Sequence, residues 1–198
     1  MTLILASQSA GRRALLTQAG ISHQAMTALC DEETEKAKLK AAGVDAHALA
    51  LGLAEAKDRS VSLERPGDLI LGCDQTLALD DGQMFDKAPS LAALAEQLAT
   101  LSGRTHSLFA AMAVVRDGAV IWSHVEEARL TMRPLSSEFI VDYLNQEGEG
   151  LLSGVGGYRI EGRGIQLFER VEGNHFTIIG LPLLPLLVFL REAGIAPQ

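Results

Sequence analysis

The sequence lacks an apolar run long enough to cross a membrane. Its longest such run, Ile178 to Leu190, is interrupted by prolines and falls short of the ~20 residues that a spanning helix needs. We predict that it forms a core strand followed by a helix. The two cysteines, Cys30 and Cys73, match no metal-binding spacing, and no signal-peptide pattern opens the chain. We therefore expect reduced thiols, no membrane segment and a cytoplasmic protein.

The chain also lacks positive net charge. Its formal net charge is -8 at pH 7, and its sequence pI is about 5.1. Such a protein repels nucleic-acid backbones and anionic membranes unless a local basic cluster overrides the average. We therefore expect no nucleic-acid partner, and a small anionic ligand that carries a divalent cation fits the composition better.

Two common nucleotide-binding motifs are missing. The chain has neither Gly-x-Gly-x-x-Gly before a helix nor Gly-x4-Gly-Lys-Ser/Thr, which argues against standard dinucleotide and P-loop sites. Hydrophobic residues make up 47% and charged residues 21% of the 198 residues, with no low-complexity tract or linker. This composition predicts one globular domain over residues 1–198 with an ample core.

The start of the chain places two hydroxyls and two arginines directly after an apolar trio. Residues 3–13 predict a strand, a polar turn and the first turn of a helix that Gly20 ends. Cations in a first helical turn are unfavourable unless an anion lies nearby, and Ser7, Arg12 and Arg13 can all bind phosphate oxygens. We therefore predict a polyphosphate site; the alternative is an ordinary strand-turn-helix with solvated arginines.

A second informative stretch is a buried strand that leads into an acid. The apolar run at 69–72 predicts a strand with Asp74 at its C-terminal edge, where ligands bind in α/β sheets. Asp74 is therefore a candidate metal ligand or general base, with a turn-capping role as the alternative. The strand continues over 77–79 into an Asp-Asp-Gly turn and back over 84–85, which would bring Lys87 near Asp74.

The rest of the chain alternates helical and strand patterns. We expect helices at 46–60, where Lys57 suits the C-terminal end, at 91–101 after Ser90, and from Ser136 or Ser137 to about Gly148. An Asp-Gly turn between 105–116 and 119–132 predicts a long β-hairpin. A strand pair at 165–171 and 176–181 and a closing helix from Pro182 or Pro185 complete the prediction.

Between these elements lies a segment that is dense in glycine. Glycines at 148, 150, 154, 156, 157, 162 and 164 interrupt any regular strand or helix. Such a segment is a shaped loop whose backbone can approach a ligand closely. It also carries Tyr158, Arg159, Glu161 and Arg163, while His106, in the hairpin, is more often structural than catalytic.

Taken together, these motifs resemble the Maf family of nucleoside triphosphate pyrophosphatases over essentially the whole chain. The family's opening Ala-Ser-x-Ser-Pro-x-Arg-Arg is matched at 6–13, except that Ala10 replaces proline. Its Leu-Ser-Gly-Arg-Thr-His is intact at 101–106. The remaining matches are Asp31-Glu32, the helix lysine Lys57, Gly72-Cys73-Asp74, Lys87-Ala88-Pro89, Glu169 to Gly173 and Ile179 to Pro182.

The resemblance implies an α/β fold with an elongated central mixed sheet, two lobes about a nucleotide-binding cleft, and usually a homodimer. It implies that a nucleoside triphosphate is hydrolysed between its α and β phosphates with Mg2+ or Mn2+. It implies that Ser7, Arg12 and Arg13 bind the triphosphate. Glu32 and Asp74 would bind the metal, and Asp74 would also orient or deprotonate the attacking water. Lys57 and Lys87 would offset the negative charge of the transition state at phosphorus.

Two positions bear on which nucleotide base the chain would prefer. Many members have Thr after the motif's Asp and Gln in the glycine-rich loop, whereas this chain has Gln75 and Glu161, as in the branch that prefers 7-methyl-GTP. Methylated guanine carries positive charge and its edge offers donors, so a carboxylate suits it. The alternatives are a pyrimidine triphosphate (UTP, dTTP or CTP), a non-catalytic nucleotide-binding regulator of cell division, or a polyphosphate or phosphosugar hydrolase that releases orthophosphate.

Overall fold

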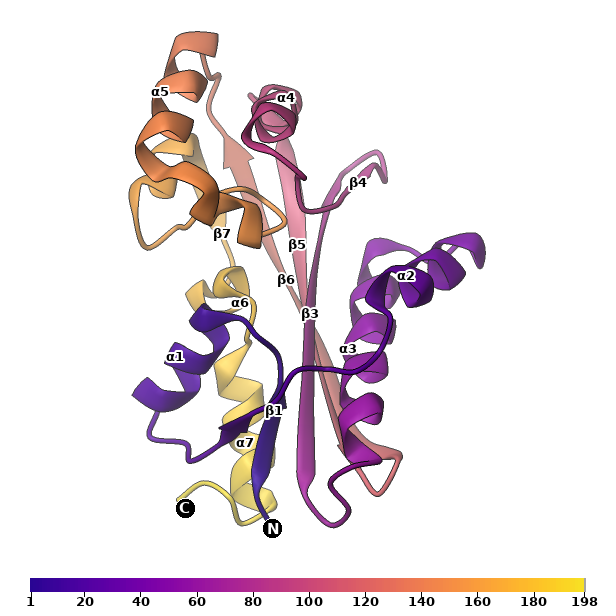
Figure 1. The fold of residues 1–198 in the computed structure, drawn as a ribbon. Helices are drawn as coiled ribbons and strands as arrows, with labels where there is room; N and C mark the ends of the chain where they lie inside the picture. The colour runs from indigo at the N-terminus through magenta and orange to yellow at the C-terminus, as the bar shows by residue number, and fades with distance from the viewer. Residues whose placement is uncertain (198) are drawn as a thin grey trace. The chain divides into compact units, whose positions relative to one another are not determined.

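The computed structural model describes residues 1–197, which form two compact units (Figure 1). The first unit comprises 1–75, 109–126 and the chain from Asn174 onward. The second unit comprises 76–108 and 127–173. Three long strands, β3, β5 and β6, have residues in both units. Each unit is described by itself below.

The described residues form one mixed sheet in the order β2-β1-β3-β5-β6-β7, with β4 paired to β3. β1 runs parallel to β2 and β3, whereas β4 is antiparallel to β3 and β7 is antiparallel to β6. The strands are β1 (Leu3–Ala6), β2 (Gln24–Ala25), β3 (Leu69–Leu79), β4 (Met84–Phe85), β5 (Thr105–Arg116), β6 (Ala119–Met132) and β7 (Phe168–Glu172).

Seven α-helices accompany the sheet within residues 1–197. They are α1 (Ala10–Gln18), α2 (Glu32–Ala41), α3 (Ala46–Ser62), α4 (Leu91–Leu101), α5 (Ser137–Glu147), α6 (His175–Ile179) and α7 (Leu183–Glu192). Two short 3-10 segments, η1 (Gly148–Ser153) and η2 (Arg163–Leu167), lie in and after the glycine-rich stretch. Hydroxyl and carboxylate caps begin most of the α-helices, among them Ser9, Asp31, Asp45 and Ser90.

In the first unit, alternate residues of β1 and β3 face opposite layers of helices. Leu5 and Leu71 join the cluster that contains Leu16 of α1 and Leu186 of α7. Their neighbours Ile4 and Ile70 pack on the other face, where α3 lies. Strands with both faces buried are continuous apolar runs, which is the pattern that both β1 and the start of β3 have.

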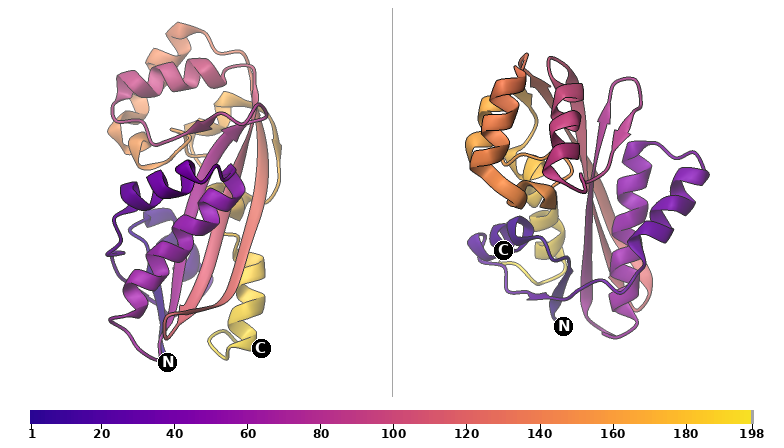
Figure 2. Two further views of the ribbon diagram at one scale, coloured as in Figure 1. Left: turned by 90° about the vertical axis from the view of Figure 1, so that its right-hand side faces the viewer. Right: turned by 45° about the horizontal axis from the view of Figure 1, so that its top comes forward.

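The second unit holds α4, α5 and the glycine-rich segment. α4 lies beside α5 (Figure 2), and the buried faces of both helices are lined by Leu94, Leu98, Ile140 and Leu144. The backbone of Gly157 packs directly against α4, because a Cβ there would lie 2.2 Å from a methyl of Leu94. The glycine-rich segment is therefore packed against this helix pair rather than extended into solvent.

Most predicted elements are confirmed, as are the α/β class and the mixed sheet. The hairpin turns at Asp117 and Gly118, which both have positive φ as a two-residue type I′ turn requires. The lobes, the cleft and the single domain stay predictions. Within residues 1–197, no helix combines the length and the apolar character that crossing a membrane requires.

Two parts of the prediction were wrong. The segment at 176–181 is the short helix α6 and its C-cap, not a strand, because Asn174 caps its start and Gly180 ends it with φ 101°. Its predicted partner at 165–171 begins as η2 and becomes a strand only at Phe168. Asp74 lies within an uninterrupted strand, not at a strand end, and what ends nearby is the parallel neighbour β1, whose last pair is Ala6 with Gly72.

Candidate active site

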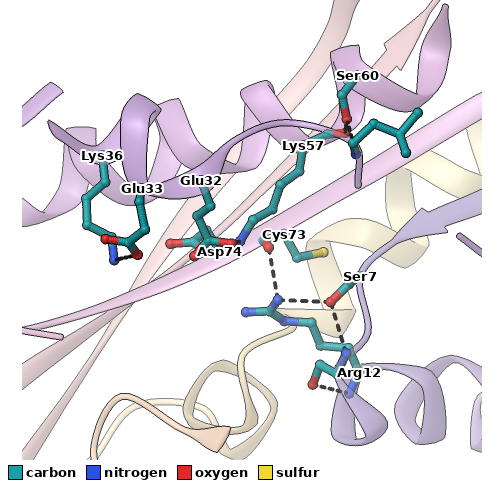
Figure 3. A network of polar contacts seen from close by, with 11 residues as sticks. Ser7, Arg12, Glu32, Glu33, Lys36, Lys57, Ser60, Cys73 and Asp74 are labelled. Carbon is teal, nitrogen blue, oxygen red and sulfur yellow. Dashed lines mark hydrogen bonds and ion pairs between the residues drawn. The ribbon is translucent and has the colours of Figure 1, made fainter. Parts of the chain in front are cut away.

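A lysine lies between two carboxylates in the first unit. Lys57 Nζ, from α3, is 2.5 Å from Asp74 Oδ1 on β3 and 2.9 Å from Glu32 Oε2 on α2. The three side chains point toward one another (Figure 3). The structure therefore brings together three residues that are distant in the sequence and that the sequence analysis had placed at the active site.

A glycine on β3 allows α3 to approach closely enough for this contact. A Cβ on Gly72 would lie 2.1 Å from the backbone oxygen of Ala54 on α3, closer than real atoms approach. Asp74 is two residues farther along the same face of the strand, and Lys57 follows Ala54 by less than a turn. Gly72 therefore lets the helix carry Lys57 to the carboxylate of Asp74.

The start of α2 supplies the third member. Asp31 caps this helix by accepting a hydrogen bond from the Thr34 amide at 3.2 Å, while its other oxygen accepts from the Thr34 hydroxyl. The adjacent Glu32 is therefore the first helical residue, and its carboxylate reaches Lys57. Of the predicted acidic pair, Asp31 shapes the helix and Glu32 faces the site.

Electrostatics keep Lys57 charged despite its burial. Burial on its own would lower the pKa of the Lys57 ammonium, but the carboxylates of Asp74 and Glu32 together raise that pKa above its ordinary value. The Lys57 side chain is 11% exposed, so its interaction with Asp74 is poorly screened by water. The three residues hold two negative charges and one positive charge in a small volume.

The Arg12 side chain is held next to Asp74, on the backbone carbonyl of the preceding β3 residue, Cys73. Its Nε donates to the Gly180 carbonyl at 2.8 Å, and its Nη1 donates to the Cys73 carbonyl at 2.9 Å and to Ser7 Oγ at 3.2 Å (Figure 3). Within residues 1–197, no hydrogen-bond acceptor is found for Nη2. A guanidinium held at Nε and Nη1, with Nη2 unpaired, can donate to an oxyanion from Nη2.

The other two members of the predicted phosphate site differ in their surroundings. Ser7 Oγ accepts from the Ser9 amide at 3.3 Å as well as from Arg12, so it shapes the turn between β1 and α1. Arg13 is exposed, and its guanidinium has no hydrogen-bond or ion-pair partner in the part of the chain that the structure describes. Arg13 is therefore available to a ligand without first breaking a protein contact.

Gln75 points away from the carboxylates. Because neighbouring residues of a strand face opposite sides, Gln75 lies on the face of β3 opposite Asp74. Its amide nitrogen donates to the carbonyls of Thr177 at 2.9 Å and Ile178 at 3.1 Å. Both hydrogens of this amide are therefore used on α6, and only its oxygen is left to contact a base.

Lys87 and Glu161 belong to the second unit. Lys87 is exposed and lies two residues after the last β3-β4 pair, which joins Leu77 to Phe85. Glu161 is exposed in the turn before η2. Because each unit is described by itself, the predicted approach of Lys87 to Asp74 and the role of Glu161 at the base both stay predictions.

Sequence reasoning missed the contacts that hold the glycine-rich segment in the second unit. The Tyr158 hydroxyl lies 2.7 Å from Nε2 of the fully buried His106, and Gln97 donates to the Val155 carbonyl at 2.7 Å. Burial lowers the pKa of His106 to about 4, so this ring is neutral near pH 7. The intact Arg-Thr-His motif was the available signal, and it marks a structural anchor for the loop.

Comparison with known proteins decides the family. The family model described as "Maf-like protein" matches residues 2–193. The chain belongs to the Maf-like protein family. This Maf-like chain is 50% identical to the "Nucleoside triphosphate pyrophosphatase" of Sphingopyxis alaskensis over 100% of both chains. It is 52% identical to the "7-methyl-GTP pyrophosphatase" of Rhizobium johnstonii over 97% of this chain and 96% of that one.

A solved structure is also similar, at a lower level. A HAM1 protein from Coxiella burnetii aligns with 67% of the Maf-like chain and 73% of its own length, at a TM-score of 0.45 and 13% identity. Structural similarity at this level does not indicate the function of the chain.

The donor set of the Maf-like chain fits a hard divalent cation. Glu32 and Asp74 offer carboxylate oxygens that already converge on one cation, the Lys57 ammonium. Residues 1–197 contain no cluster of three or more His, Cys, Asp or Glu side chains that could enclose a metal. Mg2+ typically takes one or two carboxylates and completes its shell with water and substrate phosphates, so two carboxylates suffice.

Proposed function

We propose that this chain hydrolyses a nucleoside triphosphate to the nucleoside monophosphate and pyrophosphate, with 7-methyl-GTP as the preferred substrate. Glu32, Lys57 and Asp74 beside a rigidly held Arg12 are the observation that carries the proposal. The names of relatives at 50% and 52% identity support the same reaction. Both names occur at similar identity, so the choice of 7-methyl-GTP rests on Glu161.

The proposed reaction breaks the bond between the α-phosphorus and the oxygen that bridges to the β-phosphate. A water molecule adds to the α-phosphorus, its proton is removed, and pyrophosphate leaves with the bridging oxygen. Arg12, Arg13 and Ser7 bind the triphosphate oxygens, and Nη2 of Arg12 is the main contact. Asp74 orients or deprotonates the water, while Lys57 and Lys87 offset the charge of the phosphorus in the transition state.

The proposal includes a divalent metal, Mg2+ or Mn2+, held by Glu32 and Asp74. When bound, it supplies positive charge to the phosphate oxygens and lowers the pKa of a bound water. Lys57 contacts both carboxylates, so it holds them together. This also explains how a chain of net charge -8 would bind a polyanion, because its cations are local.

The test is product analysis over a panel of triphosphates: 7-methyl-GTP, GTP, UTP, dTTP and CTP, each with Mg2+ and with Mn2+. We expect one pyrophosphate per nucleotide monophosphate and the highest kcat/KM for 7-methyl-GTP. Higher kcat/KM for UTP, dTTP and CTP would instead support the pyrimidine alternative. Orthophosphate as the first product would indicate a polyphosphate or phosphosugar hydrolase, and no turnover of any member would refute an enzymatic role.

The predicted homodimer and cytoplasmic location remain predictions, and none of the experiments above depends on them. Equilibrium sedimentation of the purified chain would test the dimer directly.

A further inference from the structure

A serine on α3 holds the loop that leads into α2. The Ser60 hydroxyl donates to the Lys57 carbonyl at 2.7 Å (Figure 3). The same oxygen accepts from the backbone amide of Leu29 at 3.0 Å, across a sequence separation of 31 residues. A hydroxyl has one proton and two lone pairs, so donating to one partner leaves its oxygen able to accept from another. Ser60 therefore joins the loop to α3 through two compatible hydrogen bonds.

The loop contacts α3 at two points with the same spacing. Leu29 pairs with Ser60, and three residues later Glu32 Oε2 lies 2.9 Å from the ammonium of Lys57, three residues before Ser60. The loop thus runs antiparallel to α3 between these contacts. Asp31 caps α2, so Glu32 is the first residue of a helix whose start is fixed by its cap. The position of the Leu29 amide therefore decides where Glu32 begins the helix.

Burial does little to hold Glu32 in place. None of the ten residues of α2, all within the described part of the chain, is buried. The Glu32 side chain is 38% exposed, whereas that of Asp74 is 11% exposed on a buried strand. The position of Glu32 relative to Asp74 therefore depends on the contacts at the start of α2, and the bond from Leu29 to Ser60 is one of them.

We propose that Ser60 is a positioning residue for Glu32. By fixing the Leu29 amide, Ser60 sets where α2 begins and hence how the Glu32 carboxylate lies relative to Asp74. Mg2+ binds oxygen at about 2.1 Å and tolerates little distortion, so two carboxylates share it only when their spacing is right. The inference rests on the proposed function, because it requires that Glu32 and Asp74 hold the metal.

The first test measures Mn2+ binding to the chain without nucleotide, from the free-ion signal in electron paramagnetic resonance. In Ser60→Ala, which removes both hydrogen bonds and favours the helix, we expect the Kd for Mn2+ to rise about fivefold. Ser60→Thr keeps the hydroxyl and should restore the wild-type Kd. Ser153→Ala is the matched control and should leave the Kd unchanged, because the Ser153 hydroxyl also donates to a carbonyl three residues earlier, that of Gly150, but on η1 of the second unit.

The second test needs no metal. Hydrogen exchange measured by NMR reports the protection of single amides, and the bond to Ser60 predicts a protected Leu29 amide in the wild type. In Ser60→Ala we expect this amide and those in the first turn of α2 to exchange about fivefold faster. A Leu29 amide that exchanges as an unprotected amide in the wild type would overturn the proposal, and this measurement decides even if Ser60→Ala does not fold.

A double-mutant cycle with Glu32→Gln separates positioning from general damage. If Ser60 acts through Glu32, adding Ser60→Ala to Glu32→Gln causes no further rise in the Kd for Mn2+. Losses that multiply would overturn the proposal, as would a wild-type Kd in folded Ser60→Ala. The Mg2+ concentration that gives the half-maximal rate with 7-methyl-GTP should rise about fivefold in Ser60→Ala, with kcat at saturating Mg2+ close to the wild-type value. A kcat that stays low at saturating Mg2+ would show that Ser60 acts on another step.

Failure of the proposed function is a separate outcome. If the wild-type chain binds Mn2+ but releases no pyrophosphate from any triphosphate, the reaction is wrong, and the Mn2+ measurements alone decide the role of Ser60. If the chain is active but Glu32→Gln binds Mn2+ as the wild type does, Glu32 is not a metal ligand and the inference fails with it. If both of these tests succeed and Ser60→Ala binds Mn2+ normally, only the inference is refuted.

Discussion

Lys57 Nζ lies 2.5 Å from Asp74 Oδ1, and this contact joins the helix α3 to the strand β3 at the centre of the candidate site. The same ammonium is 2.9 Å from Glu32 Oε2. The buried lysine therefore supplies positive charge to the two carboxylates that the proposal assigns to the divalent cation. The charge of Lys57 therefore matters both to the stability of the fold and to the proposed chemistry.

Lys57→Met tests both consequences. The variant leaves Asp74 and Glu32 facing each other with no cation, so we expect kcat to fall by about 10²- to 10³-fold. We also expect saturating Mg2+ to raise Tm more in the variant than in the wild type, because the metal replaces the missing charge. Lys38→Met, which breaks an exposed pair with Glu35, is the control. Equal Mg2+-induced Tm shifts in Lys57→Met and the wild type would contradict the shared-cation interpretation.

Asp58, next to Lys57 on α3, predicts a pH dependence of stability. Both of its oxygens are buried and lack hydrogen-bond partners among residues 1–197, and burial raises the pKa of this carboxyl to about 8. In the unfolded chain the pKa is about 4. Between about pH 4 and pH 8 the Asp58 carboxyl is ionised in the unfolded chain but protonated in the folded chain. The free energy of unfolding therefore falls as pH rises through this range.

Asp58→Asn removes this titration while keeping the shape of the side chain. We expect Tm of the variant to fall less between about pH 5 and pH 8 than Tm of the wild type. Differential scanning fluorimetry across this range measures the difference. Parallel curves for the two proteins would show that Asp58 is already ionised in the folded chain.

Arg13 should contribute to binding and not to stability. Because the Arg13 side chain is exposed and makes no hydrogen bond or ion pair with the described residues, Arg13→Ala is expected to change the free energy of unfolding by less than about 0.5 kcal/mol. We expect its KM for 7-methyl-GTP to rise about tenfold through loss of a charged phosphate contact. Arg116→Ala, at the exposed end of β5, should alter neither quantity. An unchanged KM in Arg13→Ala would remove this residue from the phosphate site.

Glu161 is expected to select the base. In Glu161→Gln the charge is lost with little change in size, so kcat/KM for 7-methyl-GTP relative to UTP should fall by about 10- to 100-fold. Glu149→Gln, also exposed in the second unit, is the control for loss of one negative charge. If the ranking of triphosphates is the same in Glu161→Gln and the wild type, Glu161 does not contact the base.

Local signals in the sequence predicted most elements. The Asp-Gly turn and the cap at Ser90 act within a few residues, and both gave the observed hairpin and helix. The error at 176–181 has a local origin too, since Thr177, Ile178 and Ile179 favour a strand by propensity. Burial and attachment of α6 by Gln75 and Glu126 override that preference, and these contacts join residues far apart in the sequence.

The candidate site also has parts that could be predicted from the sequence and parts that could not. Asp74 was predicted from the strand pattern, and Glu32 and Lys57 were named through a family resemblance, but spacing alone gives no reason for the three to meet. Their contact depends on how closely α3 approaches β3, which the backbone of Gly72 permits. The role of Gly180 could not be predicted either, because every residue has a backbone carbonyl and the residue type does not show which one accepts a hydrogen bond from Arg12.

The most direct test compares pyrophosphate release from 7-methyl-GTP by the wild type and by Asp74→Asn, with Mg2+ and under identical conditions. We predict that the variant keeps the wild-type circular dichroism spectrum, because Lys57 still pairs with Glu32, and that its kcat falls by at least about 10³-fold. Turnover at the wild-type rate by a folded Asp74→Asn protein would contradict a catalytic centre built on Glu32, Lys57 and Asp74.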